Sequence, residues 1–132
     1  MVILSFILTF RSDAISNNAK ITIYNYIGSI NKQDLISASK FISKDSKINT
    51  QSTVNNIKKI SLNKIEDETD NYLTDVYSKD TSLKDNNVKV LKVHYNIKHK
   101  NESKFKTYET LCTLIEDESG HWMIYNFDLN MN

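Results

Sequence analysis

The chain has 132 residues, 39% of them hydrophobic and 25% charged, which is enough for one domain with its own core. Its net charge is only +1, with lysines and acidic residues interleaved, and this argues against a nucleic-acid-binding surface. The single cysteine, Cys112, excludes a disulfide bond within the chain and a cysteine-based metal cluster. Its apolar neighbours indicate a small buried side chain.

Residues 1–10, MVILSFILTF, form an apolar block that suits a secretory signal peptide and is too short to span a membrane. Ser12 and Ala14 have the spacing of a cleavage site, so residues 1–14 are interpreted as a signal peptide or a truncated one. The alternative is a segment that packs on the domain, because no basic residue precedes the block. The first interpretation predicts a secreted or cell-envelope protein, and the second a cytoplasmic one. Residues 15–132 form the domain in both.

A helix is predicted after this segment, starting at a cap provided by Ser16, Asn17 or Asn18. Tyr24 lies off its apolar stripe, and Gly28 weakens it near its end. Its apolar side chains recur at spacings of three and four: Ala19, Ile23, Tyr26, Ile27 and Ile30.

A second helix is predicted from about Leu35 to Ser43, capped by Asp34, with an apolar face of Leu35, Ala38, Phe41 and Ile42. The short polar junction between the two helices predicts an αα-hairpin. Residues 44–53 are polar and small, which predicts a loop.

The central segment contains one clear strand, predicted from about Ile57 to Glu66 with a bulge. An acidic run follows at 66–70. It lacks the glycine and the terminal glutamate of a calcium-binding loop, so it is interpreted as a solvated loop. Tyr72, Leu73, Val76 and Tyr77 have helical spacing, and this part is left open between a short helix and an additional strand.

The C-terminal residues 88–129 are predicted to form three antiparallel strands joined by two polar turns. The hydrophobic pattern changes parity between Val90 and Leu91, which predicts a bulge there. In the last strand, Trp122 and Ile124 face one way. The opposite face is assigned to Met123, Tyr125 and Phe127. Both faces are then apolar, so a partner, a second subunit or a covering segment is expected on the outer one.

These elements predict an α+β fold with an N-terminal αα-hairpin packed on a bent antiparallel sheet of about four strands. The order resembles the cone-shaped domains of the nuclear transport factor two-like (cystatin-like) superfamily. More narrowly, three stretches resemble a bacterial family called domain of unknown function 4829: IYNYIGSINKQDLISASKFI, VKVLKVHYNIKHKNES and LIEDESGHWMIYNFDL. The resemblance implies a low-GC Gram-positive source and export, often behind a lipoprotein sequence. The lipoprotein cysteine is missing here, and the family carries over no functional residues.

No catalytic residue, metal ligand or cofactor is predicted. Asp34 is interpreted as a helix cap, and His94 lies on the parity opposite Val93 and Tyr95. If the cone holds a pocket, its candidate lining residues are Tyr24, Phe41, Tyr95, Tyr108 and Trp122.

Two classes of function remain. The first is a non-enzymatic binding or assembly domain that contacts a protein partner, or its own copy in a homodimer, through the open face of the sheet. The second is a small-molecule pocket protein, including an isomerase- or dehydratase-like enzyme, that uses the cone interior. No nucleic acid or metal is expected as a partner, and a membrane only through the N-terminal segment. A filled interior would favour the first class.

Overall fold

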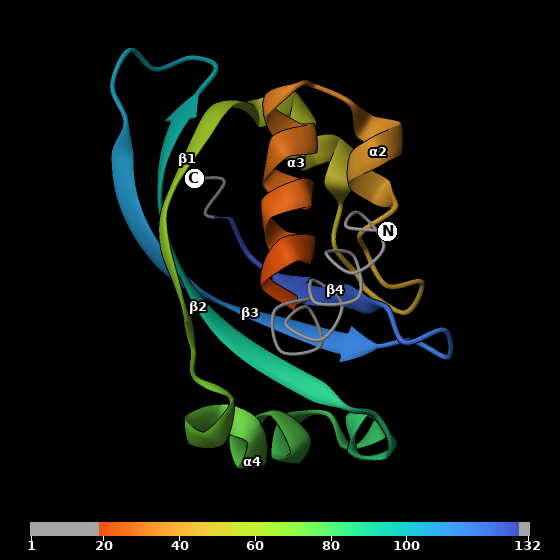
Figure 1. The fold of residues 1–132 in the computed structure, drawn as a ribbon. Helices are drawn as coiled ribbons and strands as arrows, with labels where there is room; N and C mark the ends of the chain where they lie inside the picture. Colours follow the sequence, from red (N-terminus) through yellow and green to blue (C-terminus); the bar gives the residue numbers. More distant parts are fainter. Residues whose placement is uncertain (1–18, 130–132) are drawn as a thin grey trace, which may run out of the picture.

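The computed structural model describes residues 19–129 and has an α+β fold (Figure 1). Four antiparallel strands form one sheet in the order β1-β2-β3-β4. Their bounds are Ile57–Asp67, Val88–His99, Lys106–Glu116 and Trp122–Phe127. This confirms the predicted class and the predicted sheet of about four strands. β1 also has the predicted irregularity, with register shifts between Ile57 and Lys59 and between Leu62 and Lys64.

The N-terminal helix, described from residue 19 to residue 31, lies inside the bend of the sheet (Figure 1). Every residue of its predicted apolar stripe is at most 3% exposed, as the three-and-four spacing requires. Thr22 ties the helix to the last strand, since its hydroxyl donates to the Trp122 carbonyl at 2.8 Å. The predicted caps and the 1–14 segment lie outside the described residues. Within residues 19–129, no helix is long and apolar enough to cross a membrane.

The second predicted helix is shorter than expected. α2 spans Leu35–Ser39 and is capped by Asp34, whose side chain accepts from the Ser37 N–H as predicted. Phe41 lies outside this helix, contrary to the prediction, and its carbonyl accepts from the Ile124 N–H at 2.8 Å. Ile42 forms a parallel bridge to Ile124. The helix therefore ends early because the chain leaves it to pair with the edge of β4.

The prediction of a loop over residues 44–53 is wrong from Thr50 onward. α3 spans Thr50–Asn56, and its Asn49 cap accepts from the Ser52 N–H at 3.0 Å. Thr50, Thr53 and Val54 are its buried residues. Two of these three are threonines, so the helix has no apolar stripe that sequence periodicity could detect.

Residues 72–77, for which the sequence leaves a helix and a strand open, lie in a helix. The acidic run at 66–70, interpreted as a loop, instead contains the end of β1 and the start of this helix. α4 spans Thr69–Lys79, and the 3₁₀ helix η1 spans Thr81–Asp85. They cover one end of the outer face of the sheet (Figure 1). A second apolar cluster forms there around buried Leu83, Val88, Val90 and Ile115, with Tyr72, Leu73, Val76 and Tyr77 packed against it. Of the three alternatives for the outer apolar face, a covering segment is present at this end, and it belongs to this chain.

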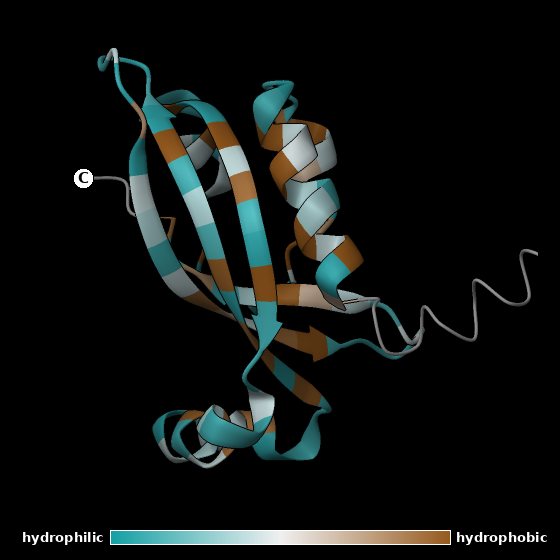
Figure 2. Ribbon diagram, turned by 60° about the vertical axis from the view of Figure 1, so that its left-hand side comes forward, coloured by the Kyte–Doolittle hydropathy of each residue, from teal (hydrophilic) through white to brown (hydrophobic). Residues whose placement is uncertain are grey.

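The second cluster also explains the parity change in β2, where the predicted bulge is absent. Val90 pairs with Thr113 and Leu91 with Cys112 in continuous register. Both Val90 and Leu91 are 1% exposed, because Val90 faces the second cluster and Leu91 the main core. Figure 2 shows the apolar and polar bands that alternate along the long strands.

The assignment of Phe127 to the face opposite Trp122 is wrong. Cys112 pairs with Phe127 and Leu114 with Ile124, and the register shifts between Thr113 and Leu114. One extra residue in β4 returns Phe127 to the core face, where it is 4% exposed. Tyr125 remains on the other side and packs against the second cluster.

Candidate functional site

The space between the N-terminal helix and the sheet is filled by aromatic rings. Phe127 lies 6.4 Å from Tyr26 and 6.2 Å from Tyr95, measured between ring centroids. Tyr26 and Tyr95 are both 0% exposed. The Tyr95 hydroxyl is 2.7 Å from the Thr110 hydroxyl and also donates to the Asp128 carbonyl at 3.4 Å. The space around Tyr26, Tyr95 and Phe127 is thus a packed core.

The Tyr26 hydroxyl is the unusual group in this core. It is buried and has no partner at hydrogen-bonding geometry within the described part of the chain. Burial raises the pKa of Tyr26 to about 12, and loose contacts with the Thr53 and Thr50 hydroxyls oppose that rise. Both threonines belong to α3. The hydroxyl therefore lies against the buried side of α3, and Thr53 also lines the cleft described next.

That cleft, called the α3–β4 cleft below, has a volume of about 460 Å³. This volume falls within the usual range for small-molecule sites. Its residues come from the loop before α3, from α3, from the start of η1, and from the end of β4 with the residues after it. They are Lys47, Ile48, Asn49, Ser52, Thr53, Asp80, Tyr125, Asn126, Phe127, Asp128 and Leu129.

Local hydrogen bonds hold the walls of the α3–β4 cleft in place. The Ser46 hydroxyl donates to the Tyr125 carbonyl at 2.6 Å and accepts from the Ile48 N–H at 3.2 Å. These bonds fix the loop before α3 against β4. On the opposite wall, the Tyr125 hydroxyl donates to the Asp80 carboxylate, which also caps η1 through the Ser82 N–H.

The carboxylate of Asp80 is held in its charged form. Its pKa is lowered by the hydrogen bond from the Ser82 side chain, then by that from Tyr125, with a further contribution from the charge of Lys47. The same bond to Asp80 raises the pKa of Tyr125. A carboxyl group with a lowered pKa suits charge recognition better than proton abstraction near neutral pH. The cleft thus combines charged rim groups with an apolar floor of Ile48, Phe127 and Leu129.

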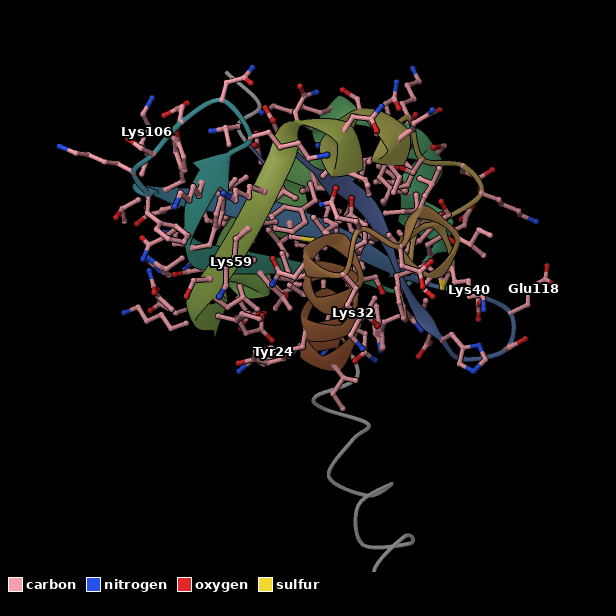
Figure 3. All side chains as sticks on the ribbon, turned by 90° about the horizontal axis from the view of Figure 1, so that it is seen from above. Tyr24, Lys32, Lys40, Lys59, Lys106 and Glu118 are labelled. Carbon is pink, nitrogen blue, oxygen red and sulfur yellow. The ribbon has the colours of Figure 1, made fainter. Side chains whose placement is uncertain are left out.

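The predicted pocket residues do not meet in one place. Tyr24 is 53% exposed on the outer side of the N-terminal helix (Figure 3). Tyr95 and Tyr108 pack together at 5.9 Å between ring centroids. Phe41 and Trp122 line a separate cleft of about 280 Å³. Sequence reasoning missed the α3–β4 cleft, because loop and turn residues with no periodic pattern supply most of its lining.

A second cleft, of about 530 Å³, lies beside the β3–β4 turn. Asp45, Glu116, Asp117 and Glu118 contribute to its lining, and all but Glu116 are exposed. Within residues 19–129, no group of three or more His, Cys, Asp and Glu side chains is arranged to hold a metal ion. The α3–β4 cleft is the better candidate because two buried residues of the main core, Phe127 and Leu129, line it, whereas the second cleft has one buried apolar residue, Ile115.

Three strands meet at His94 on the outer face of the sheet. Its Nε2 lies 2.6 Å from the Glu66 carboxylate on β1, and its Nδ1 lies 3.4 Å from the Glu109 carboxylate on β3. Lys92 is 3.7 Å from Glu109, and Lys64 is 3.7 Å from Glu66. The hydrogen bond with His94 is the main cause of a lowered pKa for Glu66. This network ties the strands together on the outer face, beyond the end that α4 and η1 cover.

Comparison of the chain with models of protein families, with curated proteins and with solved structures produced no match in any of the three. The resemblance to the family described above stays a prediction.

Proposed function

We propose that this chain is a non-enzymatic binding domain, and that the α3–β4 cleft holds its ligand. The observation that carries the proposal is the packed interior. Tyr26, Tyr95 and Phe127 occupy the space where an isomerase- or dehydratase-like enzyme with this architecture would hold its substrate. Because the interior is filled, a ligand would bind in a cleft at the surface of the domain. We also infer that the bent sheet and its inner helices, with an αα-hairpin at the start, form a nuclear transport factor two-like cone.

The lining of the cleft indicates what kind of ligand it suits. Asp80 and Asp128 contribute two carboxylates and Lys47 one ammonium group, so acidic groups outnumber basic ones. Phe127 and Leu129 provide an apolar floor at 4% and 2% exposure. A ligand with an apolar body and one amino group would match both features.

The proposal is tested with phenethylamine, a simple aromatic amine, by following backbone amide signals in two-dimensional NMR spectra. We expect selective shifts in residues 47–53 and 125–129. The anionic analogue 3-phenylpropionate should not produce these shifts. Asp128→Asn should weaken the binding of phenethylamine several-fold, because it removes one rim charge.

Glu118→Gln is the matched control, since it removes one exposed carboxylate outside the cleft (Figure 3). It should leave the phenethylamine titration unchanged. Equal shifts with the anionic analogue, or equal weakening by both substitutions, would overturn the assignment of the cleft.

A protein contact through the outer face of the sheet is a second proposal, with a second copy of the chain as the simplest partner. Its support is that α4 and η1 lie at one end of that face, so part of the face stays uncovered (Figure 1). Sedimentation equilibrium over a range of protein concentrations tests it. A strict monomer throughout would remove the homodimer.

For location, we propose export to the cell envelope or the medium of a low-GC Gram-positive bacterium. The apolar block at residues 1–10 and the small residues Ser12 and Ala14 support it. The mature N-terminus, measured by mass spectrometry on protein purified from its source, tests the cleavage after Ala14.

A further inference from the structure

The fold gathers lysines that the sequence spreads over some fifty positions. The start of β1 lies beside the end of β2, because Lys59 pairs with Lys98 and the Lys100 N–H donates to the Asn56 carbonyl at 3.0 Å. The connection between β2 and β3 extends from the same end of the sheet (Figure 1). The group, called the basic end below, consists of Lys58, Lys59, Lys98, Lys100, Lys104 and Lys106.

Acidic residues hardly balance the basic end. Glu102 is the one acidic residue in the 97–108 hairpin, and it lies 3.1 Å from Lys106. Among the described residues, no other lysine of the basic end forms an ion pair within 4 Å. Lys59 and Lys98 are direct cross-strand neighbours, an arrangement of like charges that normally destabilises a sheet. An anionic partner would relieve that repulsion.

An aromatic side chain lies within the basic end. Phe105 is 46% exposed at the start of the β3 side of the hairpin, and the Lys98 ammonium is 5.6 Å from the centre of its ring. A single exposed ring among lysines on a projecting hairpin suits insertion into the headgroup region of a bilayer. Single-stranded nucleic acid would instead need several stacking rings along a groove.

We propose that the basic end docks on a membrane surface that carries anionic lipids. The lysines would approach the phosphate groups, and Phe105 would enter the interface between headgroups and acyl chains. Acidic residues concentrate at the opposite end of the sheet, where Asp67, Glu68 and Asp70 lie at the end of β1 and the start of α4. An anionic surface would therefore favour the orientation with the basic end toward it. This surface is separate from the α3–β4 cleft.

The test uses the full chain and vesicles of phosphatidylcholine with and without phosphatidylglycerol. We expect binding that strengthens when phosphatidylglycerol is present and weakens at high salt concentration. The apolar block at residues 1–10 is the same in every variant. Its contribution therefore cancels when variants are compared on one kind of vesicle.

Lys100→Ala combined with Lys104→Ala should weaken phosphatidylglycerol-dependent binding by roughly tenfold or more. The matched control combines Lys44→Ala with Lys84→Ala, which removes the same charge from exposed positions elsewhere. It should change binding by no more than about twofold. Phe105→Ser should weaken binding about fivefold while leaving its salt dependence in place.

Equal loss of binding in both double variants would overturn the proposal, because binding would then depend on the net charge of the chain and not on the position of the lysines. Binding that does not depend on phosphatidylglycerol would also overturn it. Tight binding of a single-stranded oligonucleotide without vesicle binding would assign the basic end to nucleic acid instead. Urea denaturation of each variant shows whether it is folded. None of these outcomes depends on the phenethylamine titration, so the two proposals fail separately.

Discussion

The side-chain amide of Asn31 bonds to both backbone groups of Ile60. Its Oδ1 accepts from the Ile60 N–H at 2.7 Å, and its Nδ2 donates to the Ile60 carbonyl at 2.9 Å. Asn31 is the last residue of the N-terminal helix, and Ile60 lies on the edge strand β1. One side chain therefore joins the helix to the sheet and occupies part of an edge that could otherwise pair with another chain.

Asn31→Ala should lower the free energy of unfolding by about 2 kcal/mol, because it leaves two half-buried backbone groups without a partner. Urea denaturation measures the change. Asn63→Ala is the control, since its amide is exposed and makes a single contact of 3.4 Å with Asn96. That control should cost less than about 0.5 kcal/mol. Equal costs for the two variants would show that the Asn31 amide has no special role.

The elements that could be predicted from the sequence are those with a regular hydrophobic period. The N-terminal helix has its stripe at spacings of three and four, and the long strands alternate. Where one strand contacts two separate apolar clusters, its hydrophobic period no longer indicates which residues share a face. Val90 and Leu91 are both buried because β2 passes between the main core and α4 with η1. The sequence pattern alone could not distinguish that situation from a bulge.

The candidate site was harder to predict than the fold. Its walls depend on α3, whose buried face includes Thr50 and Thr53, and on the extra residue in β4 that returns Phe127 to the core face. Neither feature leaves a periodic signal. The capping role of Asp34 was predictable because a helix cap is a local interaction.

Tyr26 and Tyr95 allow a comparison between a buried hydroxyl that has no hydrogen-bonding partner and one that has a partner. Tyr26→Phe removes a hydroxyl without a hydrogen-bonding partner, so it should raise the free energy of unfolding by about 1 kcal/mol. Tyr95→Phe removes a hydroxyl bonded to Thr110 and should lower it by about 1 kcal/mol. Urea denaturation at neutral pH distinguishes the two signs. A loss of stability in Tyr26→Phe would mean that the contacts with Thr50 and Thr53 are real hydrogen bonds.

Alkaline pH should destabilise the wild-type protein through Tyr26. Its pKa is raised from 10.0 to about 12 in the folded state, so folding favours the neutral hydroxyl. That contribution is fully present below pH 10 and is lost as the pH rises toward 12. It amounts to about 3 kcal/mol. In Tyr26→Phe this loss is absent, so its stability advantage over wild type should grow between pH 10 and pH 12. A difference that does not change over this interval would contradict the prediction.

The segment formed by α4 and η1 should open separately from the rest of the domain. α4 has no fully buried residue, and Leu83 of η1, at 3% exposure, is the residue of this segment that is fully buried against the sheet. Leu83→Ala should cost about 2 kcal/mol and make the α4 amides exchange their hydrogens roughly 30-fold faster.

Leu114→Ala is the contrasting variant, because Leu114 is 0% exposed in the main core. It should speed exchange in the N-terminal helix, which opens only on global unfolding. The α4 amides should keep their wild-type rates, because the contacts of Leu114 persist while α4 is detached. Native-state hydrogen exchange, followed by NMR, measures both segments in one experiment. If Leu114→Ala accelerates exchange equally in both, α4 and the main core form a single cooperative unit.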